Sequence, residues 1–391
     1  MRHIKLLAVL LSLLVAAVPC ATPQVPDAAA IMARIEGPQH PDRGGYDSYS
    51  LRDLMNRLGV RGVSIAIIRD FKIHWAKAYG VADVSTGAAV DTETLFQAAS
   101  ISKPVAAMAV LRAVQDGRFS LDTNINGILT SWKIKQSQWT VTLRSLLSHT
   151  SGADDGFGFP GYAPTATLPT IVQILNGEKP SNTGPVLFTR PPGSGYKYSG
   201  GSVTIMQLAM TDVYGKPYQD LLQELVLRPI GMTRSGYEQP LSAERDRNAA
   251  RAHNTAGQPM GVKWHAYPEL AAAGLWTTPT DLAKFALEIQ LSLQGKSNKV
   301  LSAETTRHMI TPVGVGPFAV GFTIEKRGEG WYFSHGGSNW GFRAQLIAHV
   351  SKGYGAAIMT NGDRGSTLID EMLARVASVY NWDSLDKPII R

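Results

Sequence analysis

Two side chains in one short motif have the types and spacing needed for acyl transfer. Ser100 and Lys103 stand three residues apart in Ser100-Ile101-Ser102-Lys103. On the first turn of a helix this spacing brings both side chains to one face. An amine in that position can accept the serine proton if burial and a neighbouring charge lower its pKa. We therefore predict that Ser100 is a nucleophile and that Lys103 is its base.

The sequence contains two other Ser-x-x-Lys pairs, which begin at Ser194 and Ser384. Ser100 directly precedes residues 102–115, which are apolar nearly all round and predict a helix buried inside the protein. Ser194 instead lies in a Pro- and Gly-rich stretch and Ser384 in the C-terminal tail, so that no helix fixes the geometry of either pair. The context favours Ser100 over a second interpretation, in which it only caps a helix and Lys103 lies on the surface.

Four motifs follow one another along the chain: FQAASISKP at 96–104, LLSHTSG at 146–152, YKYSG at 196–200 and HGGS at 335–338. In their order and spacing they resemble the nucleophile, turn, Tyr-x-Asn and Lys-Thr-Gly or His-x-Gly motifs of the class C β-lactamase and penicillin-binding-protein family. The resemblance extends over nearly the whole chain beyond its N-terminal segment. Several motifs in the right order are far more specific than a single one.

The resemblance implies an acyl-enzyme mechanism and a set of site residues. Tyr198 would share the proton transfers with Ser100 and Lys103. The backbone N–H groups of Ser100 and Ser338 would form an oxyanion hole. His335 and Gly337 would belong to the strand that binds the substrate. A second interpretation of His335 is a strand histidine whose partners are its neighbours.

Two positions depart from the family's pattern. Gly200 stands where the family has an asparagine that hydrogen-bonds a substrate amide, and His335 stands where many β-lactamases have a lysine. Histidine is a much weaker cation than lysine at neutral pH. We interpret His149 as a structural residue of the turn motif. The departures favour a hydrolase of small esters or amides, similar to the family's esterases and D-amino-acid peptidases.

Two alternatives remain open for the function. The first is a β-lactamase or D-alanyl-D-alanine carboxypeptidase, and the second is a penicillin-binding protein that is acylated without turnover. In each case the expected partner is a small ester, amide, D-amino-acid peptide or β-lactam. The sequence lacks the Gly-x-Ser-x-Gly, zinc-hydrolase and phosphate-loop motifs, so we expect no metal and no cofactor.

Strand-like segments occur near both ends of the chain and helical ones between them, which predicts an α/β (α+β) fold. An antiparallel sheet built from both chain ends would be flanked by helices, with residues 48–117 and 266–391 in this sheet-containing lobe. Residues 118–265 would form an inserted, mostly helical lobe, and a cleft between the lobes would hold the ligand. The predicted strands are 63–68, 73–79, 319–325, 331–334, 342–349 and 356–359, and the main predicted helices are 50–58, 102–115, one beginning at 278–281, and 366–380.

The N-terminal region predicts export. Residues 1–21 combine Arg2 and Lys5 with an apolar run that is short for a membrane span, as in a cleavable signal peptide. Residues 22–47 would form a flexible lead-in. Cys20 is the only cysteine and follows Pro19, a poor lipidation context, so a periplasmic or secreted protein is favoured over a lipoprotein. The net charge is +7, but the Lys and Arg residues are scattered along the chain rather than clustered, which argues against a nucleic-acid partner.

Overall fold

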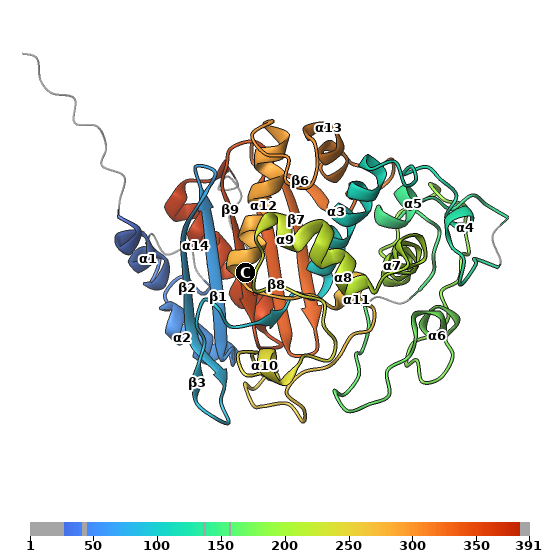
Figure 1. Cartoon of the computed structure of the whole chain (residues 1–391). Coiled ribbons are helices and arrows are strands. Elements are labelled where there is room, and N and C mark those ends of the chain that lie inside the picture. The colour runs from blue at the N-terminus through green and yellow to red at the C-terminus, as the bar shows by residue number, and fades with distance from the viewer. Residues whose placement is uncertain (1–26, 41–44, 136–137, 156–157, 384–391) are drawn as a thin grey trace, which may run out of the picture.

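The fold is a three-layer α/β arrangement around one antiparallel sheet (Figure 1). The computed structural model describes residues 27–40, 45–135, 138–155 and 158–383. Seven strands form the sheet, in the spatial order β3 (Ala88–Ala89), β2 (Lys72–Asp83), β1 (Gly62–Arg69), β9 (Gly355–Thr360), β8 (Phe342–His349), β7 (Gly330–Asn339) and β6 (Thr323–Arg327). The predicted fold class is confirmed.

The centre of the sheet joins the two ends of the chain, as predicted. Strand β1 pairs with β9, with Val63 opposite Thr360 and Ile68 opposite Gly355. Both faces of β1 are covered, because Ile65 and Ile67 belong to one hydrophobic core and Ala66 and Ile68 to another. Side chains alternate between the two faces of a strand, so the continuous apolar run at 63–68 is explained by helices on both sides.

One face of the sheet carries α1 (Ala28–Glu36), α2 (Leu51–Leu58) and α14 (Gly365–Tyr380). Helix α1 lies inside the segment expected to be a flexible lead-in, so that expectation is wrong for residues 28–36. Ile31 and Ile35 are buried. The fully buried Arg375 of α14 also anchors the segment, because its guanidinium donates to the carbonyl oxygens of Ile35, Gly37, Tyr46 and Tyr49.

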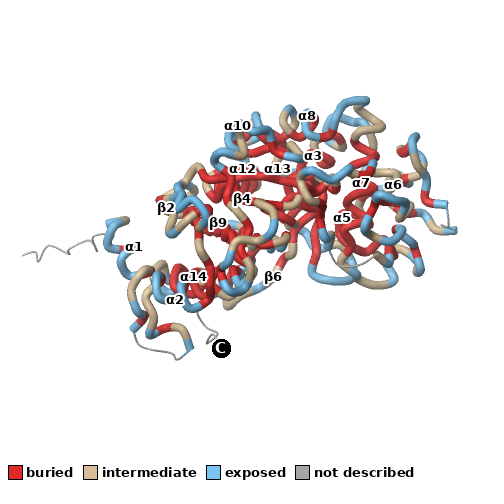
Figure 2. The backbone as a smooth tube through the Cα atoms, turned by 90° about the horizontal axis from the view of Figure 1, so that it is seen from below, coloured by how far each residue is buried: buried red, intermediate tan, exposed pale blue. Residues whose placement is uncertain are grey.

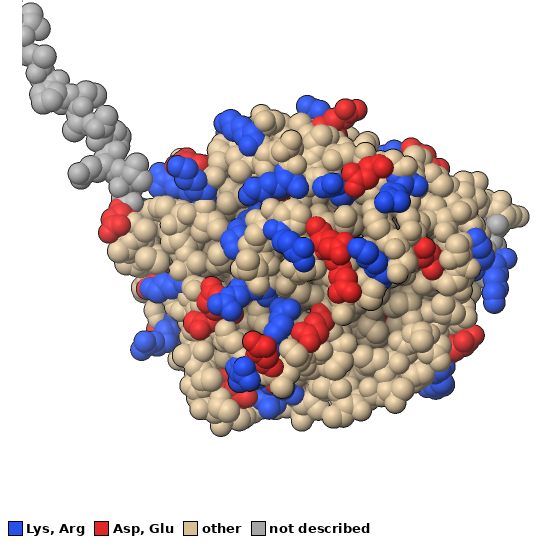
Figure 3. All heavy atoms as spheres, in the orientation of Figure 1, with Lys and Arg blue, Asp and Glu red and all other residues tan. Residues whose placement is uncertain are grey.

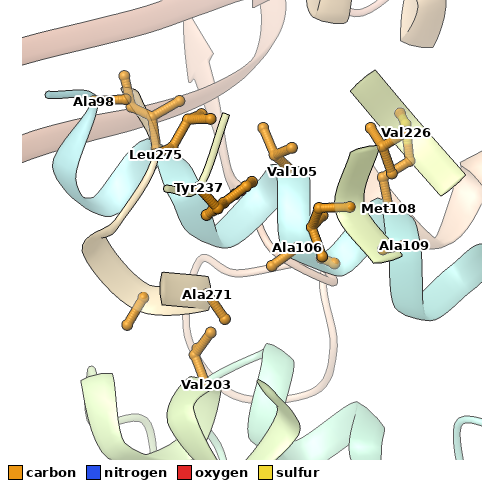
Figure 4. Close-up of a cluster of buried hydrophobic side chains, with 14 of the residues drawn as sticks. Ala98, Val105, Ala106, Met108, Ala109, Val203, Val226, Tyr237, Ala271 and Leu275 are labelled. Carbon is orange, nitrogen blue, oxygen red and sulfur yellow. The ribbon is translucent and has the colours of Figure 1, made fainter. Parts of the chain in front are cut away.

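The other face carries α12 (Pro279–Leu293) and, beyond it, α3 (Ser102–Gln115). Figure 2 shows that the buried part of the chain is continuous from the sheet into the helices around α3. Eleven of the fourteen residues of α3 are buried, as its apolar sequence predicts. The close-up in Figure 4 shows Val105, Ala106, Met108 and Ala109 of α3 among side chains of other elements: Ala98, Val203, Val226, Tyr237, Ala271 and Leu275.

Most of the remaining helices gather on the side of α3 that faces away from α14 (Figure 1). The remaining helices are α4 (Ile125–Ile128), α5 (Leu143–Leu147), α6 (Ile171–Asn176), α7 (Gly200–Tyr214), α8 (Tyr218–Leu222), α9 (Arg228–Ile230), α10 (Ala243–Asp246), α11 (Leu270–Ala273) and α13 (Ala303–Thr306). Of these, α9 and α10 lie on the α14 side of α3 in Figure 1. A small two-stranded sheet of β4 (Phe96–Gln97) and β5 (Trp276–Thr277) lies at the start of α3.

Two strand predictions differ from the structure. The sequence predicted a strand that ends at Ser334, but β7 continues through two glycines to Asn339. A strand was also expected from residue 319, whereas β6 begins at Thr323. Within the described parts of the chain, no helix is both long and apolar enough to cross a membrane. On the face drawn in Figure 3, basic and acidic side chains are intermixed, which fits a solvated surface.

Candidate active site

Ser100 lies in a tight turn that leads into α3. Residues Ala99–Ile101 form one turn of 3₁₀ helix, and Ala99 has a positive φ of 50°. A non-glycine residue in this region costs of order 1–2 kcal/mol and needs support from its surroundings. Ser102 supplies that support, because its Oγ donates to the Ala99 carbonyl at 2.6 Å and accepts from the backbone N–H of Leu275 at 3.0 Å.

Lys103 is directed at Ser100, as predicted from the spacing. Its Nζ lies 3.0 Å from Ser100 Oγ and donates to the carbonyl of Ala272 at 2.8 Å. The side chain is buried, and this burial lowers its pKa to about 7, against the opposing charge of Asp155. A lysine with this pKa is largely a neutral amine just above pH 7, and a neutral amine can take the proton of the serine.

Tyr198 joins the pair from the segment before α7. It hydrogen-bonds Ser100, and Lys103 Nζ lies 5.0 Å from the centroid of its ring. Burial raises the pKa of Tyr198 above its usual value, and the hydrogen bond with Ser100 only partly offsets that effect. Its hydroxyl is therefore a phenol at neutral pH, able both to donate and to accept a hydrogen bond. The three predicted catalytic side chains thus lie together.

His149 contacts Tyr198 from the turn motif. Its Nδ1 accepts the backbone N–H of Ser199 at 3.2 Å, and its ring stacks on that of Tyr198. Burial and the Lys103 charge lower the pKa of His149 well below its usual value, so the ring is neutral. These contacts agree with the structural interpretation of His149 and add that it orients Tyr198.

His335 lies on β7 and is buried. Its Nδ1 donates to the Gly336 carbonyl at 2.7 Å, and among the described residues no group hydrogen-bonds Nε2. Burial and the nearby charge of Lys103 lower its pKa to about 3. The ring is therefore neutral, and its free nitrogen can accept but not donate a hydrogen bond in this tautomer. His335 cannot act as a lysine-like cation at neutral pH.

The second half of β7 presents an open edge beside the turn that carries Ser100. Strand β6 pairs only with residues 330–334, so no described strand covers residues 335–339 on that side. A Cβ on Gly337 would collide with the carbonyl oxygen of Ala98. This close approach requires glycine and brings β7 against the turn that carries Ser100. Ser338, one residue further, is exposed.

Several residues around the site had no recognisable signal in the sequence. The carbonyl of Ala272 holds Lys103, and a backbone group has no side-chain signature. Asn339 donates to Gln97 at 2.9 Å and to the Ala273 carbonyl at 3.1 Å, which ties β7 to β4 and α11. Asp155 accepts from Ser199 Oγ and from the backbone N–H of Gly201.

The competing Ser-x-x-Lys pairs do not form a second site in the described residues. Ser194 is exposed and its Oγ donates to the carbonyl of Pro191, whereas Lys197 forms an ion pair with Asp154. The two side chains are thus engaged by other partners. Ser384 and Lys387 lie outside the described residues. The described part of the chain also has no group of three or more His, Cys, Asp or Glu side chains able to hold a metal ion.

A cavity of about 740 Å³ lies next to the site. Its wall includes Gly201 and Ser338, the aromatic rings of Phe159 and Trp340, and Asp155. Among the described residues Ser100 does not line the cavity, whereas Ser338 and Gly201, which neighbour the site, do. A space of this size, lined by both apolar and polar side chains, suits a small organic molecule.

The chain was compared with known families and proteins. The family model described as Beta-lactamase matches residues 50–380. Penicillin-binding protein 4 of Amycolatopsis lactamdurans is 26% identical over 342 residues, which cover 82% of this chain and 87% of the relative. Esterase EstB of Burkholderia gladioli is 27% identical over 347 residues, which cover 79% of this chain and 80% of the relative.

Solved structures share the fold. D-amino acid amidase from Ochrobactrum anthropi SV3, complexed with L-phenylalanine amide, superimposes with a TM-score of 0.69 at 21% identity and covers 90% of this chain and 99% of its own. D-alanine carboxypeptidase AmpC from Burkholderia cenocepacia gives a TM-score of 0.68 at 18% identity and covers 88% of this chain and 99% of its own. At these identities the likeness concerns the fold alone.

Proposed function

Because the chain belongs to the beta-lactamase family of serine hydrolases, we propose that it hydrolyses small esters or amides through an acyl-enzyme on Ser100. The observation that carries this proposal is the 3.0 Å contact between Lys103 Nζ and Ser100 Oγ, together with a lysine pKa of about 7. A serine with a neutral amine at hydrogen-bond distance has the base that nucleophilic attack requires.

In acylation, the proton of Ser100 passes to the neutral amine of Lys103 while Oγ attacks the substrate carbonyl. The C–O or C–N bond to the leaving group then breaks, and the leaving group takes a proton from the phenol of Tyr198, which Lys103 replenishes. The proposal assigns Tyr198 this relay because it hydrogen-bonds Ser100 and lies against Lys103. General acid and base groups placed in this way typically contribute about 10²- to 10⁴-fold.

In deacylation, water gives a proton to the neutral amine of Lys103 and attacks the acyl carbonyl. The bond between this carbonyl and Ser100 Oγ then breaks, the acid leaves, and Oγ takes the proton back from Lys103. The backbone N–H groups of Ser100 and Ser338 would stabilise the oxyanion in both steps. The open edge of β7 at residues 335–339, held against the nucleophile's turn by Gly337, supports this assignment. One such donor is typically worth about 3–4 kcal/mol.

The site favours activated esters over β-lactams. A β-lactam presents a carboxylate, and His335 is a neutral acceptor that offers it no charge. It also presents an amide, to which Gly200 offers no side chain. An activated ester requires little beyond nucleophile, base and oxyanion hole.

One panel assay tests the proposal. Purified protein is given short-chain p-nitrophenyl esters, a chromogenic cephalosporin and D-amino-acid amides, and kcat/KM is measured for each. We expect the ester to be hydrolysed much faster than the cephalosporin. Comparable efficiency on both would replace the ester proposal with the β-lactamase alternative, and stoichiometric labelling without turnover would indicate a penicillin-binding protein.

We also propose that the protein is exported and loses residues 1–21, which lie outside the described residues. The short apolar run after Arg2 and Lys5 supports this. The intact mass of the mature protein measures it directly. A mature protein without Cys20 would have no thiol, whereas a diacylglycerol mass on Cys20 would show that the protein is a lipoprotein.

A further inference from the structure

The ring of Phe159 occupies the space next to Gly200. An ideal Cβ built on Gly200 would lie 2.6 Å from Cε2 and 2.8 Å from Cζ of Phe159. Real Cβ atoms essentially never approach another atom that closely, so any side chain at position 200 requires the ring to move. Gly200 follows Tyr198 by two residues, which places this ring at the edge of the catalytic group.

The segment that follows Phe159 is held in place by contacts with residues 265 and 266. The backbone of Tyr162 exchanges two hydrogen bonds with Ala266, at 2.9 and 2.7 Å. His265 Nδ1 donates to the Pro160 carbonyl at 2.9 Å, and its ring lies flat on that of Trp340 with centroids 4.0 Å apart. These contacts begin one residue after Phe159, so they limit how far the ring can move away from Gly200.

A tight turn adds a second restraint on this segment. Gly161 has a φ of +73°, and a Cβ there would lie 2.7 Å from Cζ of Tyr267 and 2.8 Å from Cβ of His265. The backbone at residue 161 is therefore packed directly against residues 265–267. The backbone that directly follows Phe159 is therefore fixed, and this restricts where the Phe159 side chain can lie.

The carboxylate of Asp155, which lies close to Gly201, is already engaged. Asp155 lies on the same wall of the cavity, with its Cγ 3.1 Å from an ideal Cβ on Gly201. Its two carboxylate oxygens accept the hydroxyl of Ser199 and the backbone N–H of Gly201. Val186 also packs against Gly201. The part of the wall next to Gly200 therefore presents aromatic and aliphatic carbon.

We propose that Phe159 is a specificity-determining residue that selects substrates with an apolar acyl group and disfavours acyl groups that carry an amide next to the scissile carbonyl. This inference rests on the proposed function and refines it. The ring fills the volume of a side chain at position 200, and an amide placed against it would lose its hydrogen bonds to water without gaining new ones. Such a loss typically corresponds to about 10- to 100-fold in kcat/KM.

The test uses two activated esters with the same leaving group and nearly the same shape. The p-nitrophenyl ester of 4-methylpentanoic acid has an apolar acyl chain, whereas that of N-acetylglycine has an amide in the corresponding position. Each rate is divided by the rate of spontaneous hydrolysis. The measured quantity is the ratio of the two kcat/KM values in wild type and in each variant.

Three variants and one control are compared. Phe159→Ala should reduce the preference for the apolar ester by about 10-fold or more. Gly200→Asn alone should lower kcat/KM for both esters and the Tm, because the new Cβ and the ring compete for one space. Phe159→Ala/Gly200→Asn should recover the Tm and shift the ratio further towards the amide-bearing ester.

Trp331→Ala is the control. It removes an aromatic ring that is 51% exposed at the start of β7 and should leave the ratio of the two kcat/KM values unchanged.

The outcomes separate this inference from the function on which it rests. A ratio that stays the same in Phe159→Ala overturns the role of Phe159 while ester hydrolysis stands. A Gly200→Asn variant that is as active and as stable as wild type shows that the ring does not restrict position 200, which also overturns it. Failure of wild type to hydrolyse either ester contradicts the proposed function itself.

Discussion

The imidazole of His149 stacks on the phenol ring of Tyr198, with centroids 4.3 Å apart and planes inclined by 30°. His149 also has a positive φ of 60°, an uncommon conformation for a residue other than glycine. Its Nδ1 accepts the N–H of Ser199, the residue after Tyr198. One ring thus holds both the side chain of Tyr198, the third proposed catalytic group, and the backbone that directly follows it.

Replacing His149 should impair catalysis without removing any reacting group. We expect His149→Ala to lower kcat by about 10- to 100-fold with little change in KM, because a misplacement of about 1 Å in the catalytic group has effects of this size. His149→Phe keeps the stacked ring and loses the acceptor for the Ser199 N–H, so its kcat should lie between that of wild type and that of His149→Ala. Steady-state kinetics on an activated ester measure the effect. A larger change in KM than in kcat would assign His149 to substrate binding.

Ser100→Ala should abolish turnover, because no other described serine has a lysine amine at hydrogen-bond distance in the site. Ser194→Ala is the matched control and should keep activity within about tenfold, since Ser194 is engaged with Pro191. After treatment with a covalent serine inhibitor, mass spectrometry of peptides should find the adduct on Ser100. An adduct on Ser194 would refute the assignment.

The pH dependence of kcat/KM should follow Lys103. Its pKa of about 7 means that the amine is protonated, and inactive as a base, below pH 7. The rate should rise about tenfold per pH unit below this value and level off above about pH 8. His335 has a pKa of about 3 and that of His149 lies well below 6.5, so neither should add a step in this range.

A pH–rate profile between pH 5 and pH 9 on an ester substrate checks this expectation. Lys103→Ala provides the control, and its residual rate should lack the rise near pH 7. A wild-type rate that is constant over the whole range would show that the neutral amine of Lys103 is not the base.

Arg375→Met should destabilise the protein strongly. The guanidinium is fully buried and pairs with Glu371 at 2.7 Å while it holds four carbonyls near α1, so its removal leaves these groups without their partner. Breaking a buried pair in this way typically costs about 3–5 kcal/mol. Urea unfolding measures the change. Lys326→Met, which breaks an exposed pair with Glu329, should change stability by less than about 1 kcal/mol.

The parts of the fold that follow from local pattern were predictable. The apolar run at 63–68 and the all-round apolar helix at 102–115 identified β1 and α3. Helix α1 was missed because a nine-residue helix between proline-rich segments is marginal alone and depends on contacts such as those of Arg375. The full length of β7 was missed because Gly337 weakens a strand pattern unless a close neighbour, here Ala98, requires it.

The candidate site also combines features that the sequence predicts with features that depend on tertiary packing. The spacing of Ser100 and Lys103 predicted their contact, since residues three apart share a helix face. The protonation state of His335 was not predictable, because its pKa depends on burial and on a lysine distant in sequence. The ring of Phe159 beside Gly200 gave no sequence signal, since the two residues meet only through tertiary packing.

The pairing of β1 with β9 has a consequence for the folding of the protein. Nearly 300 residues separate Arg69 at the end of β1 from Gly355 at the start of β9, yet the two strands are hydrogen-bonded neighbours in the centre of the sheet. Contacts between segments so far apart in sequence form slowly, because closing the long intervening loop costs entropy before the contacts can stabilise the fold. Ser100 and Lys103 can meet within one helical turn, whereas β7 reaches them only when the sheet has formed. A partly folded chain therefore holds the proposed nucleophile and base without the strand proposed to stabilise the oxyanion.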